Sequence, residues 1–253
     1  MAPLTITHGA IPPPSGGRGV DVCLSPALIS LFDVENYVVV IIDIFRATSS
    51  ICYGIDNGAV AIIPVSEVEE CIAYQQEHPE YLLAAERNGE VVEGFDFGNS
   101  PFSYTKEKVA GKTVVLTTTN GTHALHLSRK AKKVIIGSFL NLTPVCNWLK
   151  DQQENVLLVC AGWKNNFNLE DTAFAGAVVE QLKAHNFILD DAAIAANDLF
   201  QLAKGDIPAY LAKTSHSERL KKLGIEKDIA FCLQIDITSA IPVLDGERLI
   251  RLA

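Results

Sequence analysis

The sequence predicts an α/β fold with a predominantly parallel or mixed sheet and helices on both faces. One observation is a set of short apolar runs rich in β-branched residues, such as residues 38–45, which are typical of strands buried on both faces. Another is that segments with helical patterning separate these runs, so that two β-α-β-α-β series follow each other. The 253 residues, 48% of them hydrophobic, suffice for one sizeable core or for two lobes.

The first series begins after residues 1–18, which are rich in Pro and Gly and are expected to form an irregular N-terminal arm. Ser25-Pro26 starts a short helix that reaches Phe32. A capping box from Ser66 to Glu69 is expected to start one of the longer helices. Strands are predicted at 19–24, 38–45, 59–65 and 81–86, and helices at 47–58 and 66–78.

The second series is predicted to have strands at 113–119, 133–139 and 155–162, and helices at 122–131, 142–150 and 169–185. Beyond residue 190 the pattern is mostly helical, with a last strand at 229–237 and a closing hairpin at 241–252 around Asp245-Gly246. The two series indicate either one large sheet or two lobes, 19–110 and 111–253, that share the active site.

Composition excludes several classes of partner. A net charge of -9 argues against wholesale binding to nucleic acid or to an acidic membrane, because both need a basic surface. The longest apolar run, residues 37–42, is far shorter than the ~20 residues of a membrane span, and the N-terminus lacks a secretory signal pattern. Six cysteines without a C-x-x-C pair are typical of core residues in a reducing cytosol. We therefore expect a cytoplasmic protein without nucleic-acid or membrane partners, and a homo-oligomer is compatible with the sequence.

The most unusual motif is a polar string at the end of the strand predicted at 113–119. Three hydroxyls and an Asn-Gly turn precede a helix, whose first N–H groups lack intrahelical partners. The string forms either an anion cradle at the helix start or a plain turn with Thr122 as N-cap. Its members are Thr117, Thr118, Thr119, Asn120, Gly121 and Thr122.

Asp43 follows a strongly apolar strand, where a carboxylate is costly unless it is paired or bound to metal. One interpretation is a structural ion pair with Arg46. The other makes Asp43 a magnesium ligand or nucleophile and Arg46 an anion clamp, with Thr48 beside them. Because ligands bind at the carboxyl ends of parallel strands, the second interpretation predicts a site at this edge of the sheet.

Other strand ends are polar too. Glu86, Arg87, Asn88 and Gly89 combine a carboxylate, a guanidinium, an amide and a flexible glycine, and form either a binding set or a charged turn. Asn168-x-x-Asp171 resembles a capping box with acids in the first helical turn. Mg²⁺ takes one or two carboxylates plus water and substrate oxygens, so Glu170 or Asp171 could join Asp43 and Glu86 as a ligand.

Several segments together carry a family resemblance. They are DIFRATSS (43–50), AERNGEVVEGFDFGNSP (85–101), LTTTNGTHAL (116–125), VCAG (159–162) and NLEDTAFAG (168–176). In this order they resemble the 2-phosphosulfolactate phosphatase family from about residue 38 to residue 245. The resemblance implies an Mg²⁺-dependent hydrolase that converts 2-phospho-3-sulfolactate to 3-sulfolactate and phosphate, a reaction of the coenzyme M biosynthesis type.

Under this resemblance, a small anionic phosphorylated substrate meets acids, cations and N–H groups in one pocket. We expect catalytic roles for Asp43, Arg46, Glu86 and Asp171, and metal ligation by residues from the set Asp43, Glu86, Glu170 and Asp171. Substrate binding is expected from Thr48, Arg87, Asn88, Gly89, Asn99, Ser100, Thr117, Thr118, Thr119, Asn120, Gly121, Thr122 and His216. Alternatives are a phosphatase for another small phosphorylated hydroxy acid, or a non-catalytic anion-binding protein. The choice between Asp43 as nucleophile and as metal ligand stays open.

Overall fold

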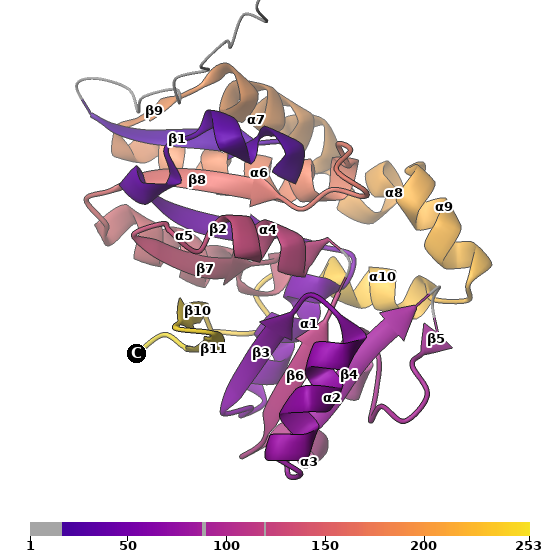
Figure 1. The fold of residues 1–253 in the computed structure, drawn as a ribbon. Coiled ribbons are helices and arrows are strands. Elements are labelled where there is room, and N and C mark those ends of the chain that lie inside the picture. Colours follow the sequence, from indigo (N-terminus) through magenta and orange to yellow (C-terminus); the bar gives the residue numbers. More distant parts are fainter. Residues whose placement is uncertain (1–16, 88–89, 119) are drawn as a thin grey trace, which may run out of the picture.

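The computed structural model describes residues 17–87, 90–118 and 120–253, and its strands form a single 11-stranded sheet (Figure 1). The predicted α/β class with a mixed, mostly parallel sheet is confirmed. The strands are β1 (Arg18–Cys23), β2 (Tyr37–Ile42), β3 (Ala61–Val65), β4 (Leu82–Arg87), β5 (Glu90–Val91), β6 (Thr113–Thr117), β7 (Lys133–Gly137), β8 (Asn155–Cys160), β9 (Phe187–Leu189), β10 (Pro242–Asp245) and β11 (Arg248–Arg251). Their order is β5-β4-β6-β3-β11-β10-β7-β2-β8-β1-β9.

The sheet consists of two parallel blocks joined by the C-terminal hairpin. β7, β2, β8, β1 and β9 pair in parallel, as do β3, β6 and β4. The hairpin β10–β11 is antiparallel to both blocks and meets each through one residue pair, Val243 with Ile135 and Leu249 with Ile62. Strands from the two predicted series are mixed in both blocks, since β6 lies between β4 and β3. The division into lobes near residue 110 stays a prediction.

Helices cover both faces of the sheet. The α-helices are α1 (Ala47–Asp56), α2 (Val68–Glu77), α3 (Lys106–Val109), α4 (Gly121–Leu127), α5 (Leu142–Asp151), α6 (Leu169–Leu182), α7 (Asp191–Ala203), α8 (Ile207–Leu211), α9 (Ser215–Lys222) and α10 (Glu226–Cys232). None of the helices in the described part of the chain is long and apolar enough to span a membrane.

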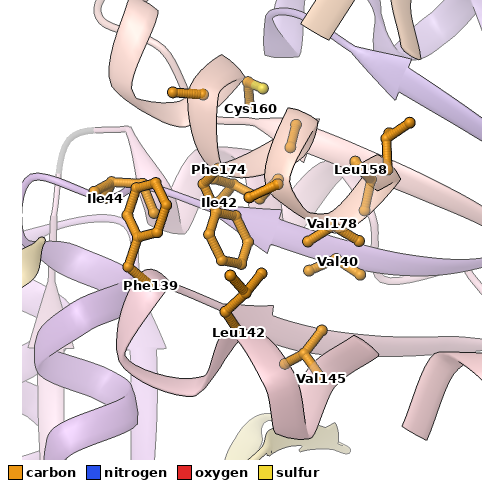
Figure 2. Close-up of a cluster of buried hydrophobic side chains, with 14 of the residues drawn as sticks. Val40, Ile42, Ile44, Phe139, Leu142, Val145, Leu158, Cys160, Phe174 and Val178 are labelled. Carbon is orange, nitrogen blue, oxygen red and sulfur yellow. The ribbon is translucent and has the colours of Figure 1, made fainter. Parts of the chain in front are cut away.

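Strand β2 shows why the apolar run folds this way. Its side chains alternate between two buried clusters, with Val40 and Ile42 on one face and Val39 and Ile41 on the other. Figure 2 shows the first cluster, in which Val40 and Ile42 lie near aromatic and aliphatic side chains from α6 and α5. Because β2 is buried on both faces, its carboxyl end is held firmly, and Asp43 follows directly.

Two expectations about local structure were wrong. The strand predicted at 229–237 is instead α10 followed by a turn, because Ile229, Cys232 and Leu233 recur at helical spacing and are buried. The turn places Asp236 in the left-handed region at φ 57°, where its carboxylate caps α5 through Thr143. The capping box of α2 lies one residue later than predicted, since Glu67 is the N-cap and its backbone N–H donates to Glu70.

Candidate active site

The carboxyl ends of β2, β4, β6 and β8 meet at a cleft of about 240 Å³. In Figure 1 the C-terminal helices α8–α10 lie on the side to which the arrows of β8 and β4 point. The structure thus brings together side chains from distant segments, as the strand-end argument predicts. Lining residues are Asp43, Phe45, Arg46, Glu86, Arg87, Asn99, Thr117, Thr118, Asn120, Trp163, Lys164, His216 and Arg219.

Asp43 occupies the turn between β2 and α1. Thr48, which is buried and does not line the cleft, fixes this turn: its Oγ1 accepts from the Asp43 N–H at 3.1 Å and its N–H donates to the Asp43 carbonyl at 3.0 Å. A Cβ on Gly121 would lie 3.0 Å from Oδ2 of Asp43, so glycine lets α4 begin close to this carboxyl. Burial raises the pKa of Asp43 to about 6 and Glu170 adds to the shift, against the lowering effect of the Gly121 N–H and Arg46.

Arg46 is held between two carboxylates. Its Nη2 lies 2.5 Å from Oε1 of Glu86, and its Nη1 lies 3.4 Å from Oδ2 of Asp228 on α10. Asp228 also accepts from Oγ of Ser100 at 3.0 Å, so Ser100 supports the pair from behind. The Nε–H of Arg46 is buried without a hydrogen-bond partner among the described residues. A buried guanidinium with an unused donor is suited to a ligand oxyanion.

The carboxyl end of β4 contributes a second cation. Arg87 is exposed, and its Nη1 donates to the Glu86 carbonyl at 3.0 Å. Asn99 lines the cleft, and its Oδ1 is buried with no partner in the part of the chain that the structure describes. Asn88 and Gly89 lie outside the described residues.

Hydrogen bonds within the threonine string and to neighbouring segments hold it in place. Oγ1 of Thr118 accepts from the Thr122 N–H at 3.2 Å, and Oγ1 of Thr122 donates to the Thr118 carbonyl. Thr117 donates to the Ser66 carbonyl at 3.0 Å, and Asn120 accepts from the Lys164 N–H at 3.2 Å. Thr119 lies outside the described residues. Thr117, Thr118 and Asn120 line the cleft, whereas Gly121 and Thr122 do not, so the anion cradle stays a prediction.

Asp171 is enclosed by hydrogen-bond donors. Oδ1 accepts from the Ile44 N–H at 2.9 Å, and Oδ2 accepts from the Gly162 N–H at 3.0 Å and from Nδ2 of Asn168 at 2.9 Å. These bonds join the loops after β2 and β8 to the start of α6. Burial, reinforced by Asp43 and Glu170, raises the pKa of Asp171 well above its usual value, while the backbone donors oppose the shift. The geometry fits a loop-tying carboxyl better than a metal ligand.

Glu170 contacts a histidine and does not line the cleft. Its Oε1 lies 2.6 Å from Nδ1 of His216, and Nε2 of His216 lies 3.0 Å from Nη2 of Arg219. An arginine only donates, so Nε2 accepts and Nδ1 carries the proton that is given to Glu170. This series of contacts fixes the His216 ring at the cleft wall, where it forms a T-shaped contact with Phe45.

The four predicted metal ligands therefore differ in their surroundings. Asp43 and Glu86 line the cleft, whereas Glu170 and Asp171 do not. No group of three or more His, Cys, Asp or Glu side chains within residues 17–87, 90–118 and 120–253 is arranged to hold a metal ion by itself. A divalent ion here would depend on one or two carboxylates together with water and substrate oxygens, which is a usual arrangement for Mg²⁺.

Comparison with known proteins defines the family. A family model described as 2-phosphosulpholactate phosphatase matches residues 23–247. The chain belongs to the 2-phosphosulpholactate phosphatase family. It is 43% identical over 225 residues to a protein from Thermotoga petrophila, covering 89% of this chain and 95% of that relative. It is 42% identical over 206 residues to a protein from Gloeobacter violaceus, covering 80% of this chain and 86% of that one. Both relatives are named probable 2-phosphosulfolactate phosphatase.

In this member of the 2-phosphosulpholactate phosphatase family, the sequence prediction missed the cleft residue Phe45 and four further cleft or supporting residues. Trp163 and Lys164 come directly after the strand predicted at 155–162, so the rule that ligands bind at strand ends could have found them. Arg219 lies three residues after His216 on the same helix face, which is a detectable spacing. Asp228 has no such signal, because the sequence predicts a strand directly after it.

Proposed function

We propose that the protein is an Mg²⁺-dependent phosphatase that hydrolyses 2-phospho-3-sulfolactate to 3-sulfolactate and phosphate in the cytoplasm, a reaction of the coenzyme M biosynthesis type. The observation that supports this most directly is that Arg46, whose buried Nε–H has no partner among the described residues, lines a cleft that also holds Asp43. The relatives' names point to the same ester.

Charge in the cleft suits such a substrate, which carries phosphate, carboxylate and sulfonate groups. Arg46, Arg87, Lys164 and Arg219 all line the cleft, although the whole chain has a net charge of -9. Local cations of this kind stabilise the negative charge of a bound phosphoryl group and of the transition state. The protein's acidic balance therefore does not conflict with an anionic substrate.

The residues also fit a bound Mg²⁺. Asp43 and Glu86 are the carboxylates that line the cleft, and carboxylate oxygens together with substrate phosphate oxygens are preferred Mg²⁺ ligands. When bound, Mg²⁺ would neutralise charge on the phosphate oxygens and polarise the phosphorus centre. Glu86 keeps Arg46 in place through one oxygen, which leaves the other for such a role.

In the proposed reaction Arg46 holds a phosphate oxygen through its Nε–H, and Arg87 holds an acid group of the substrate, because both His216 nitrogens already have partners. Phosphoryl transfer needs the attacking and leaving oxygens roughly in line, so positioning is the main task of these side chains. The attacking group is either water or the Asp43 carboxylate. Asp43 attack would give an aspartyl phosphate that water then hydrolyses, returning the carboxylate and releasing phosphate.

The test measures phosphate release from 2-phosphosulfolactate with Mg²⁺, with EDTA, and for Asp43→Asn. Under either mechanism we expect Asp43→Asn to lower kcat by about a thousandfold or more. Asp191→Asn, at an exposed position of α7 outside the cleft, is the matched control and should keep full activity. Retention of kcat within a few-fold in Asp43→Asn would overturn the assignment. A non-catalytic anion-binding protein would release no phosphate under any condition.

A further inference from the structure

A second hollow, larger than the phosphate cleft, adjoins it. Its volume is about 800 Å³, against about 240 Å³ for the cleft. It lies between the loop after β8, the first turn of α6 and the start of α9, and we call it the aromatic groove. The residues that matter for its chemistry are Trp163, Phe167, Leu169, Lys213, His216 and Arg219. Trp163, His216 and Arg219 line both hollows, so the groove and the cleft meet along these three side chains.

The groove differs chemically from the cleft. Phe167 is 50% exposed and Trp163 is 40% exposed, so two large aromatic surfaces face solvent next to a catalytic cleft. Contiguous exposed apolar surface of this kind is typical of a binding site, since covering it removes apolar area from water. A small substrate with three anionic groups would use the cations of the cleft and leave these aromatic faces uncovered.

The boundary of the groove is both cationic and held in place. The Arg219 guanidinium lies 5.4 Å from the centre of the Trp163 ring, and its Nη2 donates to His216, which Glu170 fixes from behind. Lys213 stands at the rim. An occupant that matches this surface has a flat apolar group for Phe167 and Trp163, joined to an anionic end that lies toward Arg219 and the cleft.

We propose that the aromatic groove receives the side group of larger substrates, so that the active site also accepts phosphate monoesters of 2-hydroxy acids that carry an aromatic ring. This inference rests on the proposed phosphatase function. The phosphate would bind at Arg46 and Asp43, as for the smaller ester. The ring would pass the boundary formed by Trp163, His216 and Arg219 and pack against Phe167. The bond that breaks is the same P–O ester bond, and water supplies the oxygen that appears in phosphate.

The experiment compares two esters that differ only in the ring, 2-phospholactate and 2-phospho-3-phenyllactate, with Mg²⁺. We expect kcat/KM to be about tenfold higher for the phenyl ester, since a buried aromatic group adds apolar contact. Phe167→Ala should lower kcat/KM about tenfold for the phenyl ester and leave 2-phospholactate within about twofold. Phe102→Ala is the matched control, because Phe102 is 49% exposed and lines neither hollow. It should leave both esters unchanged.

A binding measurement covers the case in which Phe167→Ala folds poorly. Titration of the wild-type protein with 3-phenyllactate should quench Trp163 fluorescence, and lactate should not. Any of three results would overturn the inference. One is a kcat/KM for the phenyl ester that is equal to or lower than that for 2-phospholactate. The others are an equal loss of kcat/KM for both esters in Phe167→Ala, and no quenching by 3-phenyllactate. If 2-phosphosulfolactate and 2-phospholactate also released no phosphate, the proposed function itself would fail. Failure with the phenyl ester alone would refute only the aromatic subsite.

Discussion

Nη2 of Arg46 lies 2.5 Å from Oε1 of Glu86, so an acidic side chain holds in place the arginine that we propose to bind phosphate. Arg46 is 5% exposed, and a buried guanidinium needs paired charges to offset its lost hydration. Glu86 supplies one and Asp228 supplies the second from α10, an element that lies far along the chain. The two carboxylates hold the terminal nitrogens and leave the Nε–H for a ligand. Positioning by Asp228 should therefore be measurable in substrate binding.

Asp228→Asn keeps the size of the side chain and removes its charge. We expect KM for the phosphate ester to rise about tenfold, with a smaller change in kcat, because a hydrogen bond to a charged partner is worth about 1.5–3 kcal/mol. Inorganic phosphate should lose affinity as a competitive inhibitor to the same degree. Ser100→Ala, which removes only the hydroxyl that supports Asp228, is the control and should raise KM less. Unchanged phosphate affinity in Asp228→Asn would show that Glu86 alone positions Arg46.

Asp171→Asn tests whether this residue ties loops or binds metal. An amide has one acceptor oxygen, so at least one of the donors from Ile44, Gly162 and Asn168 would lose its partner inside the protein. We expect the free energy of unfolding to fall by about 2–4 kcal/mol, measured by urea unfolding without metal. Stability that stays unchanged, together with a weaker requirement for Mg²⁺, would instead make Asp171 a ligand.

The contrast between Asp43 and Asp171 shows how far the sequence could predict the site. Asp43 follows a run whose side chains are buried on both faces, and that pattern places it at a strand end without any tertiary information. The role of Asp171 depends on a bond to the Ile44 N–H, 127 residues away in the chain. The spacing of the sequence indicates an acid in the first turn of a helix. Only the packed fold shows which N–H groups donate to the two carboxylate oxygens of Asp171.

Asp228 illustrates a different limit. The segment after it is apolar enough to fit a strand or a helix, and periodicity over so few residues does not separate them. The structure chooses the helix because Ile229, Cys232 and Leu233 pack into the core at helical spacing. A strand at 229–237 does not predict the contact between Asp228 and Arg46, which depends on the position of α10.

Lys164→Gln tests whether the charge of Lys164, a cleft residue that the sequence prediction missed, helps to bind the substrate. The Lys164 side chain lies over the Trp163 ring, with Nζ 4.9 Å from the ring centre, at the wall of the cleft. We expect KM for 2-phosphosulfolactate to rise about threefold to tenfold, and less at high salt, because screening weakens exposed charges. Lys150→Gln, outside the cleft, should have no effect. An increase in KM that is the same at every salt concentration would argue against a charge effect.

Asp190 should make stability depend on pH away from the active site. Burial raises the pKa of Asp190 to about 6, and Asp21 adds to this shift. The Ala193 N–H, which donates to Oδ1 of Asp190 at 2.6 Å, opposes it. A carboxyl whose folded pKa is raised favours folding when protonated. Its contribution is therefore complete below the unfolded pKa of about 3.9 and is lost as the pH rises through about 6.

Asp190→Asn removes this titration and keeps the cap of α7, because asparagine caps helices about as well as aspartate. At pH 8 we expect the free energy of unfolding of the variant to be about 1 kcal/mol higher than that of wild type, a value reduced for the partial exposure of the site. At pH 4 the two proteins should differ little. Urea unfolding at pH 4, 6 and 8 gives the comparison, with Asp198→Asn, at an exposed position of the same helix, as control. A variant that is less stable than wild type at pH 8 would mean that the charged cap outweighs the burial of Asp190.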